Sequence, residues 1–135
     1  MKRGLQIGTC ASVRDIVTPL MQAAFGGEIV HPVYGTAAMV YHMEWAARLV
    51  ILPYLEEDEE GVGTGVRLKH LSPAPVGTEI EAQAVCMKHE GNVILCDVNV
   101  FTNGELLGSG QVEQRVLPRQ VLHERFPEMW TIEGE

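Results

Sequence analysis

The sequence of 135 residues has little of what nucleic-acid-binding or membrane proteins need. Ten Lys and Arg stand against eighteen Asp and Glu, and a net charge of −8 would repel a phosphate backbone. The most apolar run, residues 37–52, contains His42, Glu44 and Arg48, so no stretch is apolar enough to span a bilayer. Residues 1–4 show no apolar segment of a secretory signal. We therefore expect a cytoplasmic protein without nucleic-acid or membrane partners.

Cysteine is also scarce, with only Cys10, Cys86 and Cys96 present. An odd number without C-x-x-C spacing argues against a disulfide framework and a structural zinc site. Cys86 and Cys96 fall on apolar strand faces, which favours small core residues over nucleophiles. The five histidines lack the spacing of metal ligands, and no nucleophile-elbow or nucleotide-binding glycine motif occurs. We expect no metal ion and no cofactor.

The chain contains no internal repeat or linker, and its 46% apolar and 21% charged residues are typical of a globular protein. We expect a single domain over residues 1–135, with a core at about residues 5–117 and a C-terminal extension at 118–135.

Residues 37–52 are rich in helix formers and apolar on nearly all sides, which predicts a buried helix about 24 Å long. Pro53 ends it, and Thr36 is a candidate N-cap. Residues 20–34 hold Gly26, Gly27 and Pro32; we expect a loop or lid there, with at most a short helix at 21–24.

The rest of the sequence alternates apolar and polar residues, as half-buried strands do. We expect extended structure within residues 5–17, an acidic loop at 56–60, strands at 66–71, 78–88, 92–101 and 105–117, and a surface helix at 119–126. The pair Asn103-Gly104 predicts a tight hairpin. This order indicates an α+β fold in which a curved antiparallel sheet wraps the helix. Open sheet edges favour a homodimer, with a tetramer left open.

Three side chains are candidates for chemistry, and each has a simpler explanation. Glu44 sits in mid-helix between apolar neighbours, but could be an exposed ion pair with Arg48. His70 shares the apolar face of its strand, where a histidine is more often a hydrogen-bonded core residue. An N-cap role would explain Thr36 completely.

Together these residues carry a family resemblance. The motifs are Tyr34-Gly35-Thr36, Met39-Val40, Met43-Glu44-Trp45-Ala46, Pro53-Tyr54-Leu55-Glu56, Gly63-Thr64, His70 and Gly108-Ser109-Gly110. Over residues 5–117 the chain resembles hot-dog thioesterases of the fluoroacetyl-CoA thioesterase type. The resemblance implies a dimer with active sites at the subunit interface that hydrolyses an acyl-CoA thioester without metal. It also implies a catalytic set of Thr36, Glu44 and His70, with Gly63 beside the substrate carbonyl.

The family chemistry leaves two roles open for Glu44, as the nucleophile or as the base that activates water. His70 would move the proton, Thr36 would orient the carboxylate or supply a hydroxyl, and the helix N-terminus would stabilise the oxyanion. Eight residues of helix span about 12 Å, which is too far for Thr36 to touch Glu44. Either the helix starts late, or the partners belong to different subunits.

The sequence departs from the family at its substrate-binding positions. Gly27 and Val30 stand where the fluoroacetyl-specific lid carries phenylalanines, so the resemblance does not extend to fluorine selectivity. The family's arginine on the last strand aligns with Gln114, while Arg115 follows on the opposite face unless a bulge restores it. The basic candidates for the CoA phosphates are scattered: Arg67, Lys69, Lys88 and Arg115.

The leading interpretation is a thioesterase for small or medium acyl-CoA substrates. A non-catalytic dimer that binds acyl-CoA or another small ligand is the alternative. A hot-dog enoyl-CoA hydratase is weaker, because no obvious Asp and His pair of that type occurs. A purely structural dimer leaves Glu44 and His70 unexplained together.

Overall fold

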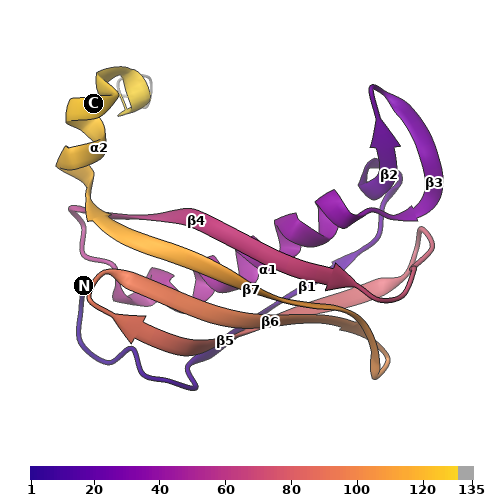
Figure 1. Cartoon of the computed structure of the whole chain (residues 1–135), viewed down its shortest axis with the longest axis horizontal. Helices are drawn as coiled ribbons and strands as arrows, with labels where there is room; N and C mark the ends of the chain where they lie inside the picture. The colour runs from indigo at the N-terminus through magenta and orange to yellow at the C-terminus, as the bar shows by residue number, and fades with distance from the viewer. Residues whose placement is uncertain (131–135) are drawn as a thin grey trace.

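Apolar side chains recur every three or four residues along helix α1 (Thr36–Ile51), and this spacing places them on one face. In the computed structural model, which describes residues 1–130, that face is buried against a sheet (Figure 1). The buried residues are Met39, His42, Met43, Ala46, Ala47, Val50 and Ile51. The predicted helix is thus confirmed, and it continues into a 3-10 turn, η2 (Leu52–Tyr54), that contains Pro53.

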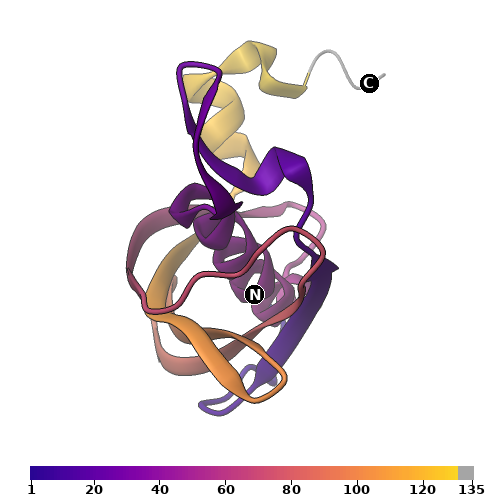
Figure 2. The same ribbon diagram turned by 90° about the vertical axis from the view of Figure 1, so that its right-hand side faces the viewer.

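The sheet has five antiparallel strands in the order β1-β5-β6-β7-β4. Their bounds are β1 (Cys10–Ile16), β4 (Glu59–His70), β5 (Glu79–Glu90), β6 (Val93–Thr102) and β7 (Glu105–Pro118). The predicted alternation holds: in β5 and β6 the inward residues are Ile80, Ala82, Ala84, Cys86, Ile94, Cys96, Val98 and Val100. Figure 2 shows the sheet curving around α1, which confirms the predicted α+β architecture.

The residues at a turn determine whether two strands can form a tight hairpin. Asn103 and Gly104 both have positive φ, at 46° and 82°, as the Asn-Gly pair predicts for the turn between β6 and β7. The short surface helix is also found, as α2 (Arg119–Arg125), followed by η3 (Pro127–Trp130). The C-terminal extension predicted at 118–135 is described as far as residue 130, and residues 131–135 lie outside the described part.

The prediction for residues 20–34 is wrong. After a 3-10 turn, η1 (Pro19–Met21), this segment forms a hairpin of β2 (Gln22–Phe25) and β3 (Glu28–Tyr34). Gly26 and Gly27 have φ values of 60° and 85°, so the two glycines make the tight turn between the strands. Pro32 is tolerated because it falls at a register shift, between the pairs Ala23–His31 and Gln22–Tyr34, where it has no partner in the ladder.

The acidic loop is also shorter than predicted, because β4 begins at Glu59 rather than at residue 66. Its early part pairs with the end of β7, as in the partners Glu60 and Leu117. Arg48 and Arg119 lie within 3.4 and 3.5 Å of the Glu60 carboxylate. These contacts let an acidic residue occupy a strand.

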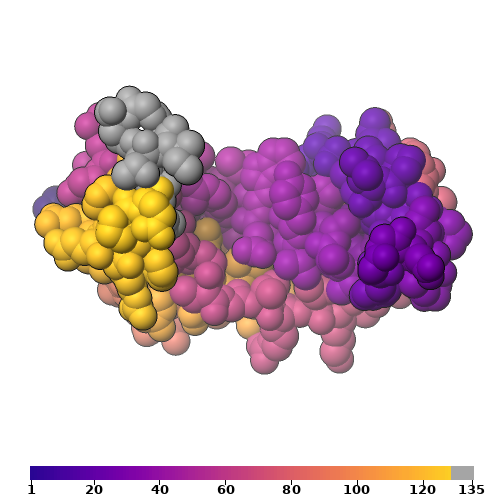
Figure 3. Space-filling model, turned by 90° about the horizontal axis from the view of Figure 1, so that it is seen from above, coloured from indigo at the N-terminus to yellow at the C-terminus, as the bar shows by residue number. Residues whose placement is uncertain are grey.

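Helix α1 is not buried on all sides, which corrects a further expectation. Tyr41 is 58% exposed and Trp45 39%, and Glu44 lies between them on the same surface. Figure 3 shows the helix uncovered between the β2–β3 hairpin and α2. One small sheet covers one face of the helix, so an aromatic surface remains open in the single chain. No helix in the described part of the chain is long and apolar enough to cross a membrane.

Candidate active site

Thr36 and His70 meet at one end of the molecule. Thr36 is the first residue of α1 and His70 the last residue of β4, and the Thr36 Oγ1 and His70 Nδ1 atoms are 3.0 Å apart. A neutral imidazole with its proton on Nε2 accepts the hydroxyl hydrogen at Nδ1. The His70 Nε2 atom is buried and has no hydrogen-bond partner among the described residues. The pair can therefore activate a hydroxyl group and keeps a second nitrogen free for a substrate or a partner group.

The simple N-cap explanation of Thr36 is wrong. The N-cap residue is Gly35, and no side-chain cap is formed. A Cβ atom at Gly35 would lie 3.0 Å from the Ala23 Cα atom, so the glycine allows the helix start to approach β2 closely. Because the cap falls one residue earlier than predicted, the Thr36 hydroxyl is left to contact His70.

Glu44 lies two turns further along α1, on its exposed side. Its Oε2 atom is so close to β4 that a Cβ at Gly63 would be 2.8 Å away. The alternative of a Glu44–Arg48 ion pair is not found; Arg48 Nη1 instead donates a hydrogen bond to the Gly61 carbonyl at 3.2 Å, and the Arg48 guanidinium contacts Glu60. The carboxylate therefore faces the glycine segment of β4.

The Glu44 side chain lines a groove of about 410 Å³ between α1, β4 and β7. Its lining combines two aromatic rings, two charged groups, two glycines and two residues of β7: Tyr41, Trp45, Glu44, Arg48, Gly61, Gly63, Val112 and Gln114. A groove with an apolar wall and a few convergent polar groups is a typical small-molecule site.

Within one chain, Glu44 does not meet the Thr36–His70 pair. Thr36 and Glu44 are eight helical residues apart, about 12 Å along the axis. Gly63 and His70 are separated by seven strand residues, about 23 Å. Since α1 begins at Thr36, the helix does not start late, and the prediction that the partners belong to different subunits stays a prediction.

The other predicted substrate-binding residues are spread out. Gly27 lies in the hairpin turn and Val30 is 50% exposed on β3; neither lines the Glu44 groove. Gln114 points inward, and its Nε2 donates to the Ala47 carbonyl at 2.9 Å. Arg115 points outward, 3.8 Å from Glu113. No bulge therefore brings Arg115 to the groove.

Of the four basic residues considered for the CoA phosphates, the structure brings two together. Arg67 and Lys69 line one groove across β4, β6 and β7, whereas Lys88 pairs with Glu90 on β5. Arg67 Nη2 also donates to Gln111 Oε1 at 2.8 Å.

The cysteines lie where the sequence places them. Cys86 and Cys96 are buried, and burial raises the pKa of Cys96 to about 12. Such a thiol stays neutral and packs as an apolar residue. Among residues 1–130, no cluster of three or more His, Cys, Asp or Glu side chains is arranged to hold a metal ion.

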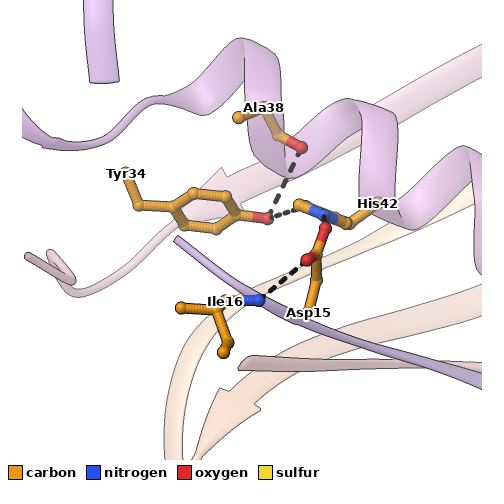
Figure 4. A network of polar contacts seen from close by, with 5 residues as sticks. All are labelled: Asp15, Ile16, Tyr34, Ala38 and His42. Atoms are coloured by element: carbon orange, nitrogen blue, oxygen red, sulfur yellow. Dashed lines mark hydrogen bonds and ion pairs between the residues drawn. The ribbon is translucent and has the colours of Figure 1, made fainter. Parts of the chain in front are cut away.

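Sequence reasoning missed a buried polar network next to the Thr36–His70 pair (Figure 4). His42 Nε2 is 2.8 Å from Asp15 Oδ2, and His42 Nδ1 is 2.6 Å from the Tyr34 hydroxyl. The hydrogen bond from His42 lowers the pKa of Asp15, and burial raises the pKa of Tyr34. The sequence position of His42 could have indicated this network. His42 shares the buried helix face of Met39 and Ala46, where a polar ring needs hydrogen-bond partners.

Comparison with known proteins identifies a matching family and similar sequences. A family model described as fluoroacetyl-CoA-specific thioesterase matches residues 17–120. A fluoroacetyl-CoA thioesterase from Streptantibioticus cattleyicolor is 32% identical over 85 residues, which span 63% of this chain and 61% of that protein. The aligned part therefore covers about three fifths of that relative.

Solved structures agree on the fold. A Thermus thermophilus hypothetical protein, described as a thioesterase superfamily member, is 40% identical with a TM-score of 0.87 over 98% of this chain and 99% of that one. A hot-dog-like protein from Thermanaerovibrio acidaminovorans has 20% identity and a TM-score of 0.82 over 96% and 93% of the two chains. A variant fluoroacetyl-CoA thioesterase, solved with acetyl-CoA, has 22% identity and a TM-score of 0.83 over 91% and 97%. The predicted hot-dog fold is confirmed.

Proposed function

The chain belongs to the fluoroacetyl-CoA-specific thioesterase family, and we propose on this basis that it is a thioester hydrolase acting on small or medium acyl-CoA substrates. The observation that carries the proposal is the 3.0 Å contact between Thr36 and His70, with His70 Nε2 buried and unpaired beside it. The imidazole can donate a proton from this nitrogen to a departing thiolate, and the hydrogen bond to the Thr36 hydroxyl fixes the ring.

The site proposed here is shared between two copies of the chain. The Thr36–His70 pair of one subunit faces Glu44 of the partner subunit, because the two cannot meet within one chain. The exposed aromatic surface of α1 around Glu44 supports this, since a second copy would cover it. The dimer is therefore part of the proposal.

In the reaction, an oxygen nucleophile attacks the thioester carbonyl. Either Glu44 takes a proton from the attacking water, or its carboxylate attacks first and water then hydrolyses the acyl-enzyme anhydride. As the C–S bond breaks, His70 donates its Nε2 proton to the departing CoA thiolate, and it regains a proton from Glu44 in the first route or from the hydrolysing water in the second. The amides of the first turn of α1, which have no acceptor within the helix, can bind the oxyanion.

The proposed chemistry uses side chains alone, without metal or cofactor. Gly63 lets the Glu44 carboxylate lie against β4, and the proposal puts the reacting carbonyl beside it, while Gly27 and Val30 lie on the hairpin that follows η1 near the start of α1. We place the protein in the cytoplasm, where acyl-CoA is made and used.

The proposal is tested by thiol release from a panel of acyl-CoA esters, from acetyl through aromatic and including fluoroacetyl. We expect Glu44→Gln and His70→Ala each to lower kcat by about a hundredfold or more, because each removes a group that handles a proton. Glu57→Gln, in the exposed loop after η2, is the matched control and should keep wild-type rates. Full activity in Glu44→Gln would refute the proposal.

A second candidate is a dimer that binds acyl-CoA without turnover. The inward-facing Gln114 favours it, because an amide cannot replace the charge of the family's arginine in this groove. Tight acyl-CoA binding in calorimetry without thiol release would establish this alternative.

A further inference from the structure

The buried network of Asp15, His42 and Tyr34 is not used by the proposed chemistry. His42 is 0% and Tyr34 1% exposed, while the Asp15 side chain retains 32% exposure at the edge of the network. Buried polar groups are costly, and an apolar pair of similar size would fill the same space without that cost. This arrangement therefore needs an explanation beyond packing.

The protons in the network can be assigned from its chemistry. An ionised Asp15 only accepts, so His42 carries its proton on Nε2 and donates it to Asp15. In the neutral ring the remaining nitrogen, Nδ1, has a lone pair and accepts the hydrogen of the Tyr34 hydroxyl at 2.6 Å, while the Ala38 carbonyl, the other acceptor near this hydroxyl, is farther away at 3.4 Å (Figure 4). The carboxylate thus sets the tautomer of His42, and the tautomer sets the direction of the Tyr34 hydroxyl.

Tyr34 is held at both ends as a result. Its backbone N–H donates to the Ala74 carbonyl at 2.8 Å, and its hydroxyl is bound to His42. The ring between these anchors meets the His70 imidazole edge to face, with centroids 6.1 Å apart and planes at 71° (Figure 4 shows the Tyr34 end). Such aromatic contacts have a preferred geometry, so a fixed Tyr34 ring restricts how the His70 ring can turn.

We infer that Asp15, His42 and Tyr34 form a positioning network that holds the His70 imidazole with Nδ1 facing the Thr36 hydroxyl. Asp15 and His42 act through Tyr34, and Tyr34 acts by its ring contact with His70. The kinetic consequence rests on the proposed function, whereas the orientation of His70 does not.

The experiment uses Tyr34→Phe, which keeps the ring and removes the hydroxyl, in the full chain. Long-range proton–nitrogen NMR spectra report the protonation and environment of each imidazole. In the wild type we expect His42 with a protonated Nε2 and a lone pair on Nδ1. In Tyr34→Phe we expect the His70 nitrogen signals to shift or broaden, and kcat for acyl-CoA to fall about tenfold with KM unchanged.

Tyr54→Phe is the matched control, since it removes a hydroxyl from a partly buried tyrosine in η2, away from His70. It should leave the His70 signals and kcat as in the wild type. Asp15→Ala is the second variant if Tyr34→Phe fails to fold; its side chain is 32% exposed at the edge of the network, and we expect the same change at His70.

Unchanged His70 signals in the folded variants would overturn the inference, and a lower melting temperature alone would then mark the network as a stabilising device. If the wild type hydrolyses none of the acyl-CoA esters, the proposed function fails, and the His70 spectra still decide whether the network positions that ring.

Discussion

At the scale of single residues, Gly63 determines where the Glu44 carboxylate can lie. The Glu44 Oε2 atom occupies the space that a side chain at position 63 would need. Gly65, two residues further along β4, has nothing closer than the Glu113 Cβ at 3.8 Å. The two glycines therefore differ in function although they share a strand.

We predict that Gly63→Ala lowers kcat about tenfold, because the new methyl group displaces the Glu44 carboxylate from β4. Gly65→Ala, the matched control, should change kcat less than twofold. Steady-state kinetics on both variants, with circular dichroism to verify folding, provide the measurement. Equal rates in the two variants would show that the position of Glu44 against β4 does not matter.

At the scale of elements, small residues on β7 let neighbouring elements approach closely. A Cβ at Gly108 would collide with the Met39 sulfur on α1, and a Cβ at Gly110 would collide with the backbone of β4 at Arg67 and Leu68. These glycines place α1 and β4 against β7, and so set the position of His70 at the end of β4.

We predict that Gly110→Ala lowers the free energy of unfolding by about 1–3 kcal/mol, because the added methyl group overpacks a backbone contact that cannot move aside. Ser109→Ala, one residue earlier and on the opposite face of β7, is the control and should stay within about 0.5 kcal/mol of the wild type. Urea unfolding measures both values. A Gly110→Ala variant as stable as the control would mean that β4 and β7 separate easily at this point.

At the scale of the whole molecule, the groups of the proposed site lie in two separate places. Thr36 and His70 lie at the end of the β2–β3 hairpin, and Glu44 lies near the middle of α1. A site that joins them needs a second copy of the chain. The uncovered aromatic surface of α1 around Glu44 is where that copy would pack.

We predict that two inactive variants restore activity when mixed. A Glu44→Gln dimer and a His70→Ala dimer, unfolded together and refolded in equal amounts, should form mixed dimers in about half of all cases. Each mixed dimer would hold one intact site, so the mixture should reach about a quarter of wild-type activity. Each variant refolded alone is the control. No recovery, with mixed dimers verified by mass spectrometry, would place all three residues of the site in one chain.

Much of this protein follows from local sequence. The 3.6-residue pattern of α1, the alternation in β5 and β6, and the Asn103-Gly104 turn each depend on residues close together in the chain, so these elements were predictable. The β2–β3 hairpin was not, because Gly26-Gly27 and Pro32 are compatible with both a loop and a ribbon. The early part of β4 was missed because its acidic residues need Arg48 and Arg119 from elsewhere in the fold.

The candidate site divides in the same way. Sequence alone indicated its residue types, since Glu44 and His70 interrupt apolar patterns and both match the family motifs together with Thr36. Only the tertiary structure decided that Thr36 contacts His70 across 34 positions, that Glu44 lies apart from both, and that Asp15 reaches His42 in the core. Hydrogen bonds between distant residues depend on the register of the sheet and its packing on α1, and no local pattern carries that information.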